Sequence, residues 1–163
     1  MNSVFNWMES TWINSLALNY TWTWPILETL HFIGMSLLIG AILVMDLRLL
    51  GVQRVIPSLT VHQLLPLAFI GFGINLLTGI VFLFGDPFRY AANPSFQMKM
   101  VLILLAGLNA LLYAKKVAPA LHAAPQHSDT PGIAKAVGAT SIVLWIGVIV
   151  FGRLIPYLGL GEL

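Results

Sequence analysis

Long and nearly uninterrupted apolar runs divide most of the chain into four segments. Each run is about as long as the ~20 residues that a helix needs to cross a bilayer. The runs are continuously apolar instead of alternating, which favours helices over the strands of a membrane barrel. We therefore expect an all-α protein whose four transmembrane helices lie near Pro25–Leu50, Gln63–Phe84, Phe96–Ala118 and Lys135–Leu158.

The residues before the first run carry a different pattern, dense in tryptophan. Trp7, Trp12, Trp22 and Trp24 all lie there, with Tyr20 between them. Tryptophan and tyrosine favour the headgroup layer of a membrane. We expect residues 1–24 to form a short amphipathic helix on the outer membrane surface, and residues 25–163 to form the transmembrane domain. A loosely attached tail is the alternative.

The composition agrees with a membrane protein. Hydrophobic residues make up 58% of the 163 residues and charged residues only 9%, where soluble proteins carry about 25% charged residues. The mean hydropathy is +0.88. The absence of cysteine excludes disulfides, thiolate catalysis and iron–sulfur clusters. A net charge of only +2 without a basic arm gives no reason to expect a nucleic-acid partner.

Lysine and arginine in the connections indicate the orientation. Arg48 and Arg54 lie at the first connection, and Lys115, Lys116 and Lys135 lie around the third. Basic residues favour the cytoplasmic side of a membrane. Both termini are therefore expected outside. No cleavable secretory signal is expected, since no lysine or arginine opens the chain.

Helical spacing indicates which residues face inward. In the first run, Glu28, His31, Met35, Ile42 and Asp46 lie on one stripe. Ionisable residues in a membrane almost always face the bundle interior, so this stripe is expected to be the inner face.

The other three runs carry comparable stripes, in which small residues indicate close helix packing and no chemical role. The stripes are Gly71, Asn75, Thr78 and Gly79; Lys99, Ala106, Asn109 and Tyr113; and Gly138, Trp145, Ile149 and Pro156.

Alternating helix direction brings several polar residues to the outer part of the bundle. They are Glu28, His31, Lys99, Arg153 and Tyr157, with Asp86, Arg89 and Tyr90 just above them. A buried ionisable group in a membrane is a functional hypothesis by default. Candidate catalytic residues are Glu28 and Lys99.

His31 is the one histidine within a run, and a neutral imidazole suits haem iron. The candidates for holding the cofactor are Lys99, Arg153, Arg89 and Tyr157. The three cationic side chains among them would bind the haem propionates. The sixth coordination position of the haem iron would be filled by Met98, Met100 or Lys99, be filled by a residue of a second copy of the chain, or stay empty.

Three other interpretations compete with haem. The same residues suit a quinone pocket, where a histidine and a carboxylate exchange protons with a ring oxygen. They also suit a purely structural ion-pair network that fixes helix register. A metal permease is the weakest alternative, because the methionines form no ladder through the core.

The loop His122–Gly132 is expected to be solvated and not to bind a metal.

The residues as a set resemble a known kind of protein. "WPILETLHFIG", "DLRLLG", "GFGINLLTG", "YAANPSFQMK" and "SIVLWIGVIVFGR" occur in this order between Trp24 and Tyr157. Together they resemble an uncharacterised family of four-helix bacterial inner-membrane proteins that carries a domain-of-unknown-function label. The resemblance implies the four-helix bundle and an inner-membrane location with periplasmic termini, and no activity.

The stretch "LHFIGMSLLIGAILVMDLRL" also resembles the first span of the membrane protoporphyrinogen oxidase of the HemJ type and of the copper-resistance D proteins. In the HemJ type, the resemblance implies haem b and an important pair formed by a first-span histidine and a third-span lysine. His31 and Lys99 occupy these positions, and Arg48 matches an arginine at the end of that span. Leu38 and Met45–Asp46 stand where that family has tryptophan and proline, and its lysine–proline ending is absent, so the resemblance extends to the bundle and haem site but not to the oxidase reaction.

The sequence thus predicts an integral membrane haem b-binding redox protein or redox-complex subunit, with His31 as metal ligand. The competing class is a non-catalytic membrane partner or a permease subunit, including one that takes part in copper handling. Expected partners are the lipid bilayer, a second copy of the chain or a larger membrane complex, and a quinone.

Overall fold

The computed structural model describes residues 2–52, 56–123 and 130–158. All regular elements in these ranges are helical. They are α1 (Asn2–Glu9), α2 (Trp12–Asn19), α3 (Thr23–Leu50), α4 (Ser58–His62), α5 (Leu65–Gly85), α6 (Pro87–Ala92), α7 (Pro94–Leu112), a π-helical segment η1 (Tyr113–Val117), α8 (Ala118–Ala123) and α9 (Gly132–Leu154).

Four helical stretches in the described residues are long and apolar enough to cross a membrane, as the sequence predicts. They are Thr23–Leu50, Thr60–Gly85, Pro94–Leu121 and Gly132–Leu154. The fourth differs most from its expected bounds, because Pro131 provides the helix start and the helix ends at Leu154.

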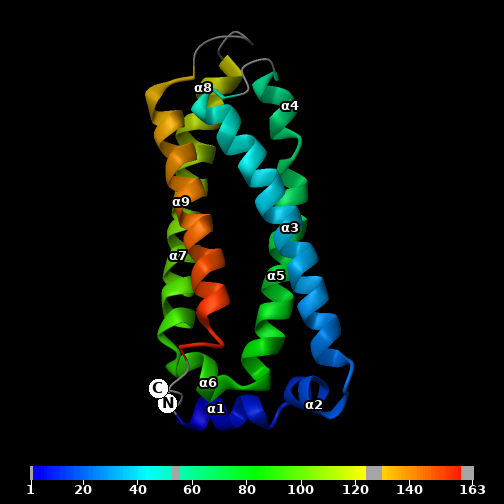
Figure 1. Cartoon of the computed structure of the whole chain (residues 1–163). Helices are drawn as coiled ribbons and strands as arrows, with labels where there is room; N and C mark the ends of the chain where they lie inside the picture. Colours follow the sequence, from blue (N-terminus) through cyan, green and yellow to red (C-terminus); the bar gives the residue numbers. More distant parts are fainter. Residues whose placement is uncertain (1, 53–55, 124–129, 159–163) are drawn as a thin grey trace.

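The long helices form two pairs, α3 with α5 and α7 with α9. The pairs meet through α3 and α9, whereas α5 and α7 make at most marginal contact among the described residues. Figure 1 shows that the pairs converge toward the end that carries α4 and α8 and diverge toward the end that carries α1 and α6. The helices therefore follow the spatial order α5, α3, α9, α7.

Glycines set the distance between paired helices. A Cβ atom on Gly71 of α5 would lie 2.6 Å from the Gly34 carbonyl oxygen and from the Leu38 backbone nitrogen of α3. A Cβ on Gly138 of α9 would lie 3.0 Å from the Leu49 Cβ. The prediction that small residues serve close packing is confirmed at both positions. Gly79 differs, because a Cβ there would meet nothing within 4 Å.

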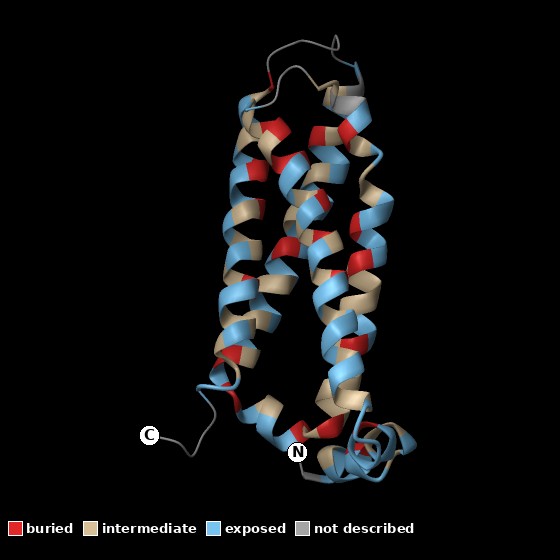
Figure 2. Cartoon of the chain, turned by 45° about the vertical axis from the view of Figure 1, so that its right-hand side comes forward, coloured by how far each residue is buried: buried red, intermediate tan, exposed pale blue. Residues whose placement is uncertain are grey.

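Most large apolar side chains face outward. Leu77, Leu104 and Val143 on three different helices are 67%, 66% and 69% exposed. Figure 2 shows buried residues as a minority along each long helix, with exposed residues between them. Such an apolar exterior is compatible with a multi-pass membrane protein, because lipid removes the cost of exposing it to water.

The N-terminal segment forms two helices instead of the expected single one. Thr11 ends the turn after α1 and caps α2, its side chain accepting a hydrogen bond from the Asn14 backbone. Both helices run across the end of the bundle (Figure 1). Asn14 donates to the Phe84 carbonyl oxygen at 2.8 Å, and Phe5 packs edge-on against Phe88. The segment is therefore attached to α5 and α6, while Trp12 and Trp22 are exposed.

A buried arginine organises the opposite end. Gly51 ends α3 with a φ of 86°, a left-handed conformation that favours glycine. Arg48 is buried; its Nε donates to the Ile56 carbonyl oxygen at 2.6 Å and its guanidinium to the Thr130 hydroxyl at 3.3 Å. It therefore links the chain after α3 to the residues just before α9.

Candidate functional site

His31 lies on the inner stripe of α3, in the half of the bundle nearer α1 and α6. Its Nδ1 is 2.7 Å from the Thr78 hydroxyl of α5, and its ring packs edge-on against Phe82. Thr78 donates its single hydrogen to the Ile74 carbonyl oxygen at 2.8 Å, as helical threonines commonly do. The hydroxyl therefore accepts from Nδ1, which leaves the lone pair on Nε2.

Lys99 lies on the inner stripe of α7, as the spacing predicts. Its Nζ would be 3.6 Å from a Cβ placed on Gly152, so the side chain extends over the glycine surface of α9. His31 lies within electrostatic range of the Lys99 ammonium. The structure thus brings the first-span histidine and the third-span lysine toward one another.

Glu28 has a different partner from those expected. It is exposed and accepts a hydrogen bond from the Trp24 indole at 3.1 Å. Among the described residues it forms no ion pair with Lys99 or Arg153. The side chain that contacts the His31 ring nitrogen is Thr78, not Glu28.

Arg153 and Tyr157 contact each other at the molecular surface. The Arg153 guanidinium donates to the Tyr157 hydroxyl at 3.2 Å and lies 5.3 Å from the centre of its ring. Both residues are exposed, so neither points into the bundle toward His31. Two predicted inner positions of the fourth apolar run, Ile149 on α9 and Pro156 just after it, are exposed as well. Ser141 and Val148 of α9 are buried.

Asp86, Arg89 and Tyr90 form a polar group on α6 and the residue before it. The Asp86 carboxylate caps the helix by accepting from the Arg89 backbone at 3.1 Å. Burial raises the pKa of the Tyr90 phenol; the Arg89 cation lowers it, and Asp86 and Glu28 raise it. The three side chains and Glu28 therefore share one electrostatic environment at the α1–α6 end. Arg89 itself is exposed.

Other candidate ligands do not surround His31. Met98 and Met100 flank Lys99 and are exposed. His62 contacts Tyr113 at the far end of the bundle, with Nδ1 2.8 Å from the phenol oxygen. The described residues contain no cluster of three or more metal-ligating side chains. His127 and Asp129 of the polar loop lie outside the described residues.

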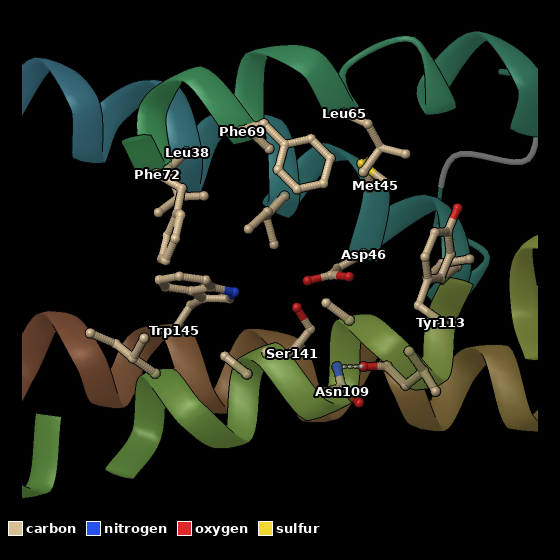
Figure 3. A pocket seen from close by; sticks show the side chains of 18 residues that line it. Leu38, Met45, Asp46, Leu65, Phe69, Phe72, Asn109, Tyr113, Ser141 and Trp145 are labelled. Atoms are coloured by element: carbon tan, nitrogen blue, oxygen red, sulfur yellow. Dashed lines mark hydrogen bonds between the residues drawn. The ribbon is translucent and has the colours of Figure 1, made fainter. Parts of the chain in front are cut away.

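A second feature, which the sequence did not reveal, is a cavity of about 230 Å³ in the other half of the bundle. All four long helices contribute to its wall, and Asp46 of α3 faces it (Figure 3). Asp46 is 5% exposed, and its Oδ2 has no hydrogen-bond partner among the described residues. The helical stripe places Asp46 on the inner face, but apolar wall residues are indistinguishable from packed core in a sequence.

Comparison with known proteins gives a family. A family of unknown function (DUF6644) matches residues 4–158. No curated protein and no solved structure matches the chain. Because the match covers nearly the whole chain, the protein belongs to this uncharacterised family, as its sequence resemblance predicted.

Proposed function

We propose that this member of the family is an integral membrane haem b-binding redox protein or redox-complex subunit, with His31 as axial ligand. The observation that carries the proposal is the 2.7 Å contact between His31 Nδ1 and the Thr78 hydroxyl. Thr78 fixes Nδ1 as the donor, which leaves Nε2 as a neutral nitrogen base. Ligating histidines typically donate their other ring nitrogen to an oxygen in this way.

The surroundings of His31 fit the cofactor. Phe82 supplies an aromatic wall, and Lys99 supplies an amine that suits either a propionate or the sixth coordination position. A second copy of the chain is the other source of a sixth ligand. Bound haem would supply one-electron transfer. Arg89, Arg153 and Tyr157 are exposed toward the same end and suit the propionates once a larger complex or the headgroup layer encloses them.

The resemblance to the HemJ type supports the same site. His31 and Lys99 are the two positions that the resemblance singles out, and they lie within electrostatic range of each other. In this proposal Lys99, within the bundle, and Glu28, at its outer rim, balance charge and exchange protons at the site. A quinone is the matching redox partner, because it exchanges protons with such groups.

The proposal includes an orientation in the bacterial inner membrane. α1 and the end of α9 lie at the same end of the bundle (Figure 1). Arg48, Lys115 and Lys116 lie toward the opposite end, which the distribution of basic residues assigns to the cytoplasm. Both termini and His31 are then on the periplasmic side.

An absorption spectrum of protein purified in mild detergent from haem-replete cells tests the proposal. We expect a Soret band that His31→Ala abolishes. Thr78→Val removes the acceptor for Nδ1 and should weaken haem affinity by about 10- to 100-fold. Thr29→Val is the matched control, because Thr29 of the same end bonds only its own helix at the Pro25 carbonyl oxygen.

Two results would contradict the haem site. One is a colourless wild-type protein, which favours a non-catalytic partner or a permease subunit, copper-linked or otherwise. The other is an undiminished Soret band in folded His31→Ala, which places any haem elsewhere.

A further inference from the structure

The cavity around Asp46 is separate from the His31 site. Asp46 is fifteen positions beyond His31 on α3, or about 22 Å along the axis at 1.5 Å per residue. His31, Thr78 and Lys99 do not line the cavity. Whether haem binds at His31 therefore does not decide what this cavity binds.

A buried carboxylate with a free oxygen is the main polar feature of the wall. Burying an ionised carboxylate is costly unless it is paired. Ser141 is its polar neighbour. Asn109 directs its amide nitrogen to the Val137 carbonyl oxygen at 3.0 Å, and Tyr113 contacts His62. No lysine, arginine or histidine is among the described lining residues, so the wall supplies no counter-ion.

The rest of the wall is apolar and rich in aromatic rings. Phe72 and Trp145 lie on one side of Asp46 and Tyr113 on the other, with Phe69 above it in the view of Figure 3. Aromatic faces attract organic cations, and a nearby carboxylate adds to that attraction. We propose that this cavity binds a small lipophilic cation, an ammonium group on an apolar body, with Asp46 as its counter-ion.

The cavity opens on the side where the helix bundle is incomplete. Phe69 of α5 and Gly107 and Ala110 of α7 line it and are exposed. α5 and α7 are the two long helices that make at most marginal contact with each other. A lipophilic cation dissolved in the bilayer therefore reaches Asp46 laterally, between these two helices.

The volume restricts the ligand to about the size of one ring with a small headgroup. About 230 Å³ is less than the ~300–1,000 Å³ of pockets for drug-sized ligands. Phenyltrimethylammonium is a suitable probe, because its charge does not depend on pH. Its uncharged isostere, tert-butylbenzene, has the same shape and tests whether charge decides binding.

The experiment is equilibrium dialysis of both probes against the full chain in lipid nanodiscs, with empty nanodiscs subtracted. We expect saturable binding of phenyltrimethylammonium at least tenfold tighter than that of tert-butylbenzene. Asp46→Asn keeps the side-chain shape and removes the charge, so it should weaken cation binding at least tenfold and leave tert-butylbenzene unchanged.

A steric variant makes the test independent of Asp46. Gly107→Phe adds a ring at the cavity wall, where a Cβ meets nothing within 4 Å, and we expect this ring to obstruct the cavity and abolish binding of both probes. Gly40→Phe is the matched control, because Gly40 is exposed, equally unobstructed and outside the cavity. The proposal is overturned by non-saturable binding to the wild-type protein, by equal affinity for both probes, or by unchanged cation affinity in folded Asp46→Asn or Gly107→Phe.

Discussion

At the scale of single residues, the same amino acid has different roles that only the neighbouring helix defines. Gly71 and Gly79 lie on one predicted stripe of α5, and helical spacing treats them alike. A Cβ on Gly71 would collide with backbone atoms of α3, whereas a Cβ on Gly79 would meet open space. His31 is similar, because its usefulness as a ligand depends on Thr78 of another helix.

The glycine contrast gives a stability prediction. Gly71→Ala forces α3 and α5 apart, because backbone atoms at 2.6 Å cannot rotate away. We expect it to lower the free energy of unfolding by about 1–3 kcal/mol. Gly79→Ala should leave stability unchanged or raise it by up to about 1 kcal/mol through helix propensity. Unfolding in mixed micelles, followed by circular dichroism, measures both; equal effects would show that Gly71 does not set the helix distance.

At the scale of elements, side chains at helix ends connect segments that are distant in sequence. Asn93 is 1% exposed and caps α7 by accepting from the Ser95 and Phe96 backbones at 2.9 and 3.3 Å. Its amide nitrogen donates to the Ile155 carbonyl oxygen at 2.8 Å, just after α9. One residue thus both starts α7 and holds the end of α9 against it.

Two substitutions separate these roles of Asn93. Asn93→Ala removes the cap and the link, and should lower the free energy of unfolding by about 1–2 kcal/mol from the cap alone, with a further loss from the unpaired Ile155 carbonyl oxygen. Asn93→Ser keeps a neutral side-chain oxygen for the cap and is too short to replace the donor to Ile155, so an intermediate loss is expected. Urea or detergent titration measures the series, and a serine variant as unstable as the alanine variant would contradict the division.

At the scale of the whole molecule, the bundle has two different regions along its axis, because the helix pairs approach each other at one end and separate at the other (Figure 1). The pairs converge around the Asp46 cavity and diverge toward His31 and the helices that run across that end (Figure 1). In the proposed orientation, the His31 site is near the periplasm and the cavity is nearer the cytoplasmic leaflet. The orientation therefore decides which compartment and which leaflet each site serves.

Single-cysteine labelling tests the orientation directly, because the chain contains no cysteine of its own. Glu9→Cys on α1 and Ala123→Cys on α8 are exposed and lie at opposite ends. In intact spheroplasts, a membrane-impermeant maleimide should label Glu9→Cys, and it should label Ala123→Cys only after permeabilisation. The reverse pattern would place His31 on the cytoplasmic side.

The sequence alone determined the features that depend on chain-local physics. Long apolar runs require helices whose backbone groups are satisfied internally, and the spacing of Lys99, Asn109 and Asp46 along those helices determined their inner faces. Contacts between distant segments determine the pairing of the helices, the direction of the Arg153 side chain and the position of the cavity. Only the tertiary structure therefore decided that Thr78 orients His31, that Arg153 faces Tyr157, and that Asp46 borders an open volume instead of a packed core.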